Sequence, residues 1–138
     1  MSRVLVAWLL LFFSATLSAQ GVVQQGDVEI FYNAIPSGFL TADIAQNHGV
    51  LRSRTRGLLL VSVKRGEQTI EARIEAQAGA SGEAMQDLTM RPVYTNGMIS
   101  YLGNFAIAEG ESRYFQLRIT PAGGQPVELE FSQQFFDQ

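Results

Sequence analysis

Hydrophobic and polar residues alternate along most of the chain beyond residue 27, with the period of two that is typical of half-buried β-strands. The clearest example is the segment 70–77 (IEARIEAQ), in which every second residue is apolar. The segment 57–63 (GLLLVSV) is almost continuously apolar, which indicates a central strand buried on both faces. About seven strands are expected, over residues 28–33, 57–63, 70–77, 85–95, 98–102, 112–120 and 127–136.

Turn signals separate these segments at intervals of about ten residues. Asn96-Gly97 is the strongest of them and predicts a tight hairpin between its two flanking strands. Pro92 cannot donate a backbone hydrogen bond, so the end of the 85–95 segment is expected at an edge or a bend. Many short strands with regular turns predict an all-β fold, an immunoglobulin-like β-sandwich, with a small closed barrel as the alternative.

One short segment departs from the strand pattern. Residues 41–48 (TADIAQNH) predict a helix of about two turns, inserted after the first strand. Thr41 is the expected N-cap of this helix, and Gly49 is its expected C-terminal stop. Ile44, together with Leu40, is expected to pack the helix onto the sandwich.

The first residues carry a targeting pattern. Arg3 precedes the apolar run 4–13 (VLVAWLLLFF), and small residues follow up to Ala19. This order predicts a secretory signal peptide over residues 1–19, cleaved after Ala19, and a single domain over residues 20–138. The apolar run is about half as long as a spanning helix requires, so no membrane span is expected after cleavage. An N-terminal anchor left uncleaved is the alternative.

The composition narrows the possible chemistry. The 138 residues include one His and no Cys, which excludes a disulfide framework, a thiol nucleophile, a Cys-based zinc site and a multi-His metal site. The net charge of −3 argues against nucleic acid as the main ligand. No cofactor is therefore expected. An exported chain without cysteine fits the bacterial periplasm, where disulfides are permitted but not required.

Candidate catalytic groups are few. His48 has no GxSxG or SxxK pattern near it, and it lies five residues from Asp43, so the two do not share a helix face. Glutamates recur in pairs, as on the outward face of any amphipathic strand. Two carboxylates across a cleft could cleave a glycosidic bond, so the alternative function is a small envelope-polymer hydrolase using paired Glu or His48. The pairs are Glu71/Glu75, Glu109/Glu111 and Glu128/Glu130.

The strongest candidate binding feature is a row of arginines. Arg52, Arg54 and Arg56 occupy alternate positions, so their guanidinium groups would point to one side of an extended segment. Such a row can hold phosphates, sulfates or carboxylates bidentately; the structural alternative is protection of an edge strand. We expect a non-enzymatic binding or protein-interaction module that recognises an envelope protein or an anionic ligand. Its expected contact residues are Tyr32, Asn33, Phe39, His48, Arg52, Arg54 and Arg56.

Phenylalanines are concentrated near the C-terminus, at Phe131, Phe135 and Phe136. These side chains are expected to belong to the core and to the closing strand of the fold. The alternative is that an exposed final strand docks on a partner protein by strand addition, with main-chain hydrogen bonds supplying the affinity.

The stretch from Val28 to Gly66 resembles a known family of exported proteins. The matching residues are Tyr32-Asn33-Ala34, Phe39-Leu40, Gly49, Arg52-Ser53 and Arg56. Their pattern is similar to that of small exported proteins of gamma-proteobacteria known only as a domain of unknown function. The chain departs from the family pattern, which has His, Phe, Tyr and Asn, at Phe31, Ile35, His48 and Leu60. The resemblance covers nearly all of the predicted mature chain and implies a periplasmic, single-domain protein, without implying any activity.

Overall fold

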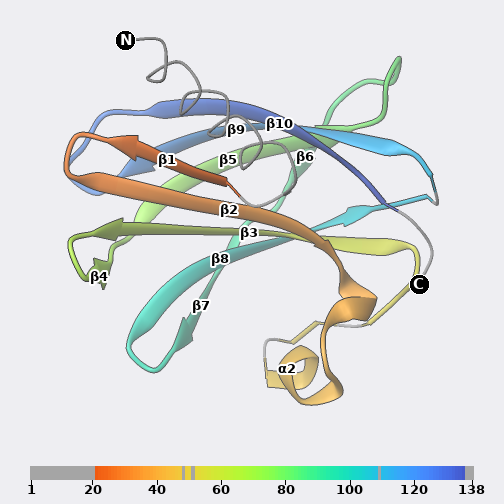
Figure 1. The fold of residues 1–138 in the computed structure, drawn as a ribbon, viewed down its shortest axis with the longest axis horizontal. Helices are drawn as coiled ribbons and strands as arrows, with labels where there is room; N and C mark the ends of the chain where they lie inside the picture. The colour runs from red at the N-terminus through yellow and green to blue at the C-terminus, as the bar shows by residue number, and fades with distance from the viewer. Residues whose placement is uncertain (1–20, 48, 51, 109, 136–138) are drawn as a thin grey trace, which may run out of the picture.

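Two antiparallel β-sheets pack face to face in the computed structural model of the chain (Figure 1). The structure describes residues 21–47, 49–50, 52–108 and 110–135, and the predicted signal peptide over 1–19 lies outside these ranges. None of the helices in this part of the chain is long and apolar enough to cross a membrane. In chain order the elements are β1 (Gly21–Gln25), β2 (Val28–Pro36), the 3-10 helix η1 (Ser37–Phe39), α2 (Ala42–Asn47), β3 (Arg56–Arg65), β4 (Gln68–Thr69), β5 (Ala72–Gly79), β6 (Gln86–Leu88), β7 (Arg91–Thr95), β8 (Met98–Ala106), β9 (Ser112–Pro121) and β10 (Val127–Gln134).

The strands divide into a six-stranded sheet, which we call sheet A, and a four-stranded sheet, sheet B. Sheet A has the order β1-β2-β3-β8-β7, with β4 paired to the end of β3, and sheet B has the order β10-β9-β5-β6. The apolar run 57–63 lies in β3, which pairs with β2 on one side and with β8 on the other. Asn96 and Gly97 have φ of 52° and 78°, as the predicted tight hairpin requires. The predicted all-β sandwich is confirmed.

The structure has ten strands where the alternation predicted about seven. β1 precedes the first expected strand, and β4 is a two-residue strand that returns along the end of β3. The expected 85–95 strand is divided, because β6 pairs with β5 in sheet B whereas β7 pairs with β8 in sheet A. Both parts are edge strands, which agrees with the edge position expected from Pro92.

Two very short links carry the chain from one sheet to the other. Residues 70–71 join β4 of sheet A to β5 of sheet B, and residues 89–90 join β6 of sheet B to β7 of sheet A. The Ile70 N–H donates to the Val63 carbonyl at 2.8 Å, and the Ala72 N–H donates to the Tyr101 hydroxyl at 2.9 Å. Both links lie on the side of the sandwich bounded by β7 and β6. Among the described residues, no such link joins β1 to β10 on the opposite side.

Aromatic side chains form a continuous series through the space between the sheets. The ring centroids of Tyr32 and Phe131 are 4.7 Å apart, and Phe131 stacks on Phe115 at 4.7 Å. Phe115 meets Phe105 edge to face at 4.9 Å, and Phe105 lies 5.5 Å from Phe135. Each such pair contributes about 1 kcal/mol beyond the burial of its area. The core position expected for Phe131 and Phe135 is confirmed, and Phe136 lies outside the described residues.

The outer faces of the two sheets differ in polarity. Side chains on the outer face of sheet B are polar or charged and include those of Arg73, Glu75, Gln77, Gln116, Arg118, Glu128 and Glu130. The outer face of sheet A is apolar over β2, β3, β8 and β7, at Ile35, Leu58, Leu60, Val93 and Leu102. A second, smaller core forms on this face, where Ala45 and Val50 pack against Leu58 and Leu102. We call the described residues of 37–55 the covering segment, because this segment buries that face (Figure 1).

The helix of the covering segment has the caps that the sequence predicted. The Thr41 hydroxyl accepts a hydrogen bond from the Ile44 N–H at 3.2 Å. At the other end Gly49 has a φ of 68°, and the Val50 N–H donates to the Ala45 carbonyl at 2.7 Å. Of the two residues expected to pack the helix onto the sandwich, Leu40 is partly buried against the second core. The expectation for Ile44 is wrong: Ile44 is 44% exposed, whereas Ala45 is 3% exposed and faces the sheet.

Candidate functional site

The arginine segment, residues 52–56 (RSRTR), joins the covering segment to β3. Arg54 and Thr55 form a turn, and Arg56 is the first residue of β3, so the segment is not one continuous extended strand. Arg52, Arg54 and Arg56 are nevertheless all exposed. The sequence predicted that the three arginine side chains point to one side of an extended segment. In the structure they lie in and beside an exposed turn.

A buried serine fixes the position of the arginine segment. Ser37 is 0% exposed, and its hydroxyl donates to the Ser53 carbonyl and accepts from the Ser53 N–H, both at 2.9 Å. The Ser53 hydroxyl in turn accepts from the Thr55 N–H at 3.1 Å. The Ile107 N–H donates to the Thr55 carbonyl at 2.9 Å and ties the segment to the end of β8. Ser53 and Thr55 therefore attach the segment to the fold, while the intervening arginines extend into solvent.

The arginine segment takes no part in the ion pairs that the described residues form. Ion pairs elsewhere are Arg65–Asp27 at 3.3 Å, Arg113–Glu111 at 3.8 Å and Arg118–Glu128 at 3.9 Å. Among the described residues, no carboxylate forms such a pair with Arg52, Arg54 or Arg56. Three guanidinium groups within five residues thus present positive charge and bidentate donors to an outside partner.

The other predicted contact residues are not gathered around the arginines. Tyr32 points into the sandwich and packs on Phe131, while Asn33 lies on the outer face of sheet A opposite Leu60. Tyr32 and Asn33 line a separate hollow of about 370 Å³ near β1. Phe39 is the last residue of η1. Its side chain, and the whole of His48, are not among the parts of the chain that the structure describes.

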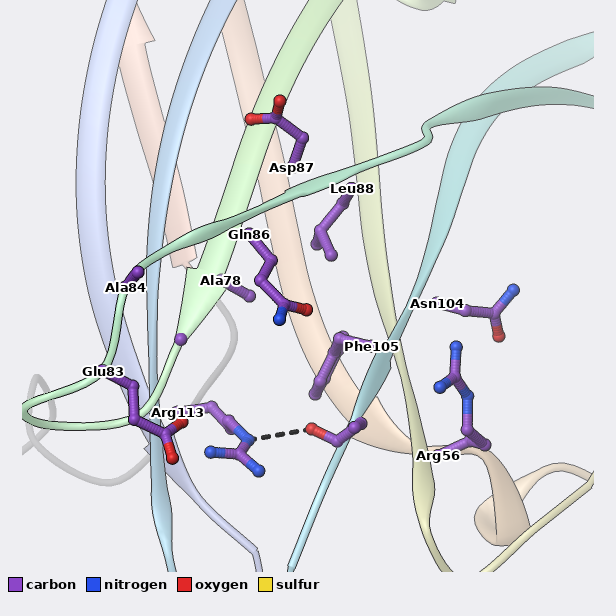
Figure 2. A pocket seen from close by; sticks show the side chains of 12 residues that line it. Arg56, Ala78, Glu83, Ala84, Gln86, Asp87, Leu88, Asn104, Phe105 and Arg113 are labelled. Carbon is purple, nitrogen blue, oxygen red and sulfur yellow. Dashed lines mark hydrogen bonds between the residues drawn. The ribbon is translucent and has the colours of Figure 1, made fainter.

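A hollow opens beside Arg56 because two neighbouring strands differ in length. β7 pairs with β8 only from Met98 to Leu102, so Gly103–Ala106 of β8 have no β7 neighbour. A space of about 330 Å³ opens there between the two sheets. Figure 2 shows Gln86 pointing into this space, with Phe105 to its right and Arg113 at the lower end of the space. We call it the end hollow.

The end hollow has an apolar floor and a rim that carries both signs of charge. Ala78, Leu88 and Phe105 line its floor. Arg113 is held in place, since its Nε donates to the Ala106 carbonyl at 2.8 Å and its side chain is only 14% exposed. The remaining polar rim residues are Arg56, Glu83, Gln86, Asp87 and Asn104. Such a rim can hydrogen-bond a polar segment of a partner protein, with the arginine segment beside it to receive acidic groups.

Sequence reasoning identified Arg56 and missed the rest of the end hollow. Gln86 and Arg113 fall at inward positions of their strands, in the same alternation as the core residues of those strands, and Asn104 lies beyond the expected 98–102 strand. A polar side chain at an inward position is therefore a local signal for the hollow. It is not sufficient, because the hollow itself arises from the unequal lengths of β7 and β8. The division of the 85–95 segment between two sheets would have been the necessary signal.

Two glutamates of the predicted pairs, Glu75 and Glu128, lie on the exposed outer face of sheet B. Glu75 and Glu128 border a shallow hollow of about 280 Å³ on the outer face of sheet B. Arg118 lies between them in the strand register and approaches Glu128 at 3.9 Å. Exposed carboxylates separated by an arginine form a solvated ionic surface, whereas hydrolysis needs one acid and one base facing a bound bond. Glu109 lies outside the described residues.

Metal ligands do not converge in the described parts of the chain, where no group of three or more His, Cys, Asp or Glu side chains could hold an ion.

Comparison with known proteins places the chain in a family. A search of curated proteins finds no match. Among solved structures, the crystal structure of a DUF4426 family protein from Pseudomonas aeruginosa PAO1 is similar, with a TM-score of 0.76, 25% identity, and coverage of 87% of this chain and 97% of that one.

Two structures of FetP from uropathogenic Escherichia coli strain F11 share the fold. A copper-bound variant of FetP gives a TM-score of 0.60 at 12% identity, covering 88% of this chain and 97% of that one. FetP expressed recombinantly in the periplasm of E. coli gives 0.59 at 11% identity, with the same coverage. The family model described as a domain of unknown function, DUF4426, matches residues 22–138. The chain therefore belongs to the DUF4426 family.

Proposed function

We propose that the protein is a non-enzymatic binding module of the periplasm, and that it recognises an acidic surface of an envelope protein through the arginine segment. The observation that carries the proposal is the set of exposed arginines without an internal carboxylate partner in the described structure. A free anionic ligand is the other outcome of the test described below.

The anchoring of the arginine segment supports a recognition role. A surface that is already ordered loses less conformational entropy when it binds, so more of its interaction energy appears as affinity. The hydrogen bonds of Ser37 and Ser53 supply that order without using any guanidinium group. The arginines therefore remain available to an outside partner.

The end hollow supports a protein partner over a small anion. Its rim carries acidic as well as basic side chains, which would repel a free phosphate or sulfate as much as attract it. A protein surface can instead place acidic groups on the arginine segment and a polar loop in the hollow. Arg56 borders both features and would join them into one contact surface.

Crosslinking in the periplasm tests the proposal. A tagged chain is expressed from its own N-terminus, crosslinked in intact cells, and recovered for mass spectrometry alongside the triple variant Arg52→Ser/Arg54→Ser/Arg56→Ser. The matched control is Lys64→Ser/Arg73→Ser/Arg118→Ser, which removes the same charge elsewhere. The expected result is a chain beginning at Gln20 in the periplasmic fraction, with one partner that is lost in the arginine variant and kept in the control.

Three results would contradict the proposal. A partner retained by the folded arginine variant would place recognition elsewhere on the surface. Equal loss in both variants would show a dependence on net charge alone. Recovery of no protein partner, with a phosphate- or sulfate-bearing glycan retained instead, would replace the protein partner with an anionic ligand.

A further inference from the structure

β10 is a long strand at the edge of sheet B. It spans eight residues (VELEFSQQ) without Pro, Lys or Arg, and its only charges are those of Glu128 and Glu130. Two other edges are shorter: β6 has three residues, and β7 has five and carries Arg91 and Pro92. β1, the edge of sheet A on the same side, has five residues. An edge of this length is a template for another strand.

The backbone groups that face the open edge can be assigned from the ladder. The Phe135 N–H donates to the Glu111 carbonyl at 3.3 Å, and the Phe135 carbonyl accepts from the Gly110 N–H, so residue 135 bonds toward β9. Alternate residues of a strand bond in opposite directions, so the residues one step away bond outward. The outward-bonding residues are therefore Glu128, Glu130, Ser132 and Gln134.

A bond on the far side of β9 supports this assignment. The Ala122 N–H donates to the Glu71 carbonyl at 2.9 Å, which fixes the even-numbered residues of β9 as those bonded to β5. The odd-numbered residues of β9 then bond to the odd-numbered residues of β10. In the described structure, the N–H groups of Glu130 and Ser132 accordingly have no partner strand.

Apolar side chains also remain incompletely covered along this edge. Leu129 and Phe131 face the interior of the sandwich yet stay half-buried, unlike Phe115 on β9, which is 1% exposed. A strand added beside β10 would cover them.

We propose that β10 pairs with β10 of a second copy of this chain, antiparallel and centred on Phe131. In this register Glu130 lies opposite Ser132 of the partner subunit, and Glu128 lies opposite Gln134 of the partner subunit. All four outward-bonding residues of each chain then meet outward-bonding residues of the other. The two sheets B merge into one continuous eight-stranded sheet.

The distribution of charge along β10 fits an antiparallel copy in this register. The two acidic residues lie in the first half of β10, and the second half carries uncharged Ser and Gln, so an antiparallel copy places carboxylates against neutral side chains. Centring the pair on Glu130 would instead place two carboxylates opposite each other, and a parallel copy would align each Glu with its equivalent. Like charges directly opposite are destabilising in a sheet.

Sedimentation equilibrium of the mature chain, purified from the periplasm, tests the proposal. The wild-type chain is expected to dimerise reversibly at concentrations up to roughly 0.1 mM. Ser132→Glu places a carboxylate opposite Glu130 of the partner subunit twice per dimer, and should weaken the dimer about two- to thirtyfold. Ser132→Lys should strengthen the dimer by a similar factor.

Gln116 provides the matched control. It lies on the outer face of β9 opposite Glu130 of its own chain, but away from the open edge. Gln116→Glu and Gln116→Lys therefore place the same charges opposite Glu130, but within one chain. Both should leave the dissociation constant of the dimer unchanged. A monomer at every concentration, shifts of the same direction for both Ser132 variants, or a dimer indifferent to both would overturn the proposal.

Discussion

The outer face of sheet A carries leucines at positions equivalent to those where the outer face of sheet B carries charged side chains. Leu58 and Leu102 lie on neighbouring strands of sheet A and are 1% and 4% exposed beneath the covering segment. Glu75 and Arg118 lie on neighbouring strands of sheet B, and both are exposed. One face is thus a second core, and the other is a solvated surface.

This difference shows what holds the arginine segment in place. α2 has six residues, too few for a stable isolated helix, so its order comes from the apolar surface beneath it. That surface positions the covering segment, and the covering segment positions the arginines. Sheet B, whose outer face offers no apolar surface, carries no such insertion in the described chain.

The largest expected effect comes from opening the second core. Leu58→Ala should lower the free energy of unfolding by about 2–5 kcal/mol, because it removes buried methyl groups and leaves a cavity between β3 and α2. Urea unfolding followed by circular dichroism measures the change. Gln116→Ala on the outer face of sheet B should change stability by less than about 0.5 kcal/mol. Equal costs at the two sites would remove the proposed difference between the faces.

A smaller effect is expected from the buried hydroxyl that anchors the arginine segment. Ser37→Ala leaves the N–H and the carbonyl of Ser53 without their partner and should cost about 1–3 kcal/mol. The variant should also be cleaved faster by trypsin after the arginines of the segment, since the segment would open locally. Native-state proteolysis with mass spectrometry measures the sites and rates. Unchanged cleavage there would show that the Ser37 hydrogen bonds do not restrain the segment.

The smallest effect belongs to the ionic surface of sheet B. The side chains of Arg118 and Glu128 are 53% and 74% exposed, and their charged atoms are 3.9 Å apart. Glu128→Gln should therefore cost about 0–1 kcal/mol, and the cost should fall further in 1 M salt. Paired urea titrations at low and high salt measure it. A cost as large as that of Leu58→Ala would mean that this face is structural after all.

The alternation of residues predicted the strands well where a strand stays in one sheet with one face buried. β5, β9 and β10 follow it closely, and the core side chains of β9 are those it selects. It could not predict that the 85–95 segment changes sheets, because inward residues such as Leu88 and Met90 keep the same pattern on both sides of the link. It also failed for Ile44, because a helix of six residues has too few apolar positions to define its buried face.

Only the part of the candidate site that is contiguous in the sequence could be predicted. The arginine segment is visible in the sequence as RSRTR, and its exposure follows from charge. Its anchoring is not visible, because the Ser37 hydroxyl bonds a residue 16 positions away. Tyr32 and Asn33 do not belong to the site: both border the separate hollow near β1, and the Tyr32 ring packs inward on Phe131. The pairing of β1 with β2, which forms that hollow, is not visible in the local sequence.

The two short links between the sheets have a consequence for how the molecule moves. Residues 70–71 and 89–90 restrain one side of the sandwich covalently, in a chain that has no disulfide to restrain the other. In the described structure no chain link joins β1 to β10, and contact between the sheets on that side comes chiefly from rings such as Tyr32 and Phe131. Local opening of a single chain is therefore expected to begin there, with the linked side as its hinge, and the backbone amides of β1 and of an unpaired β10 should exchange with solvent before those of β5 and β8.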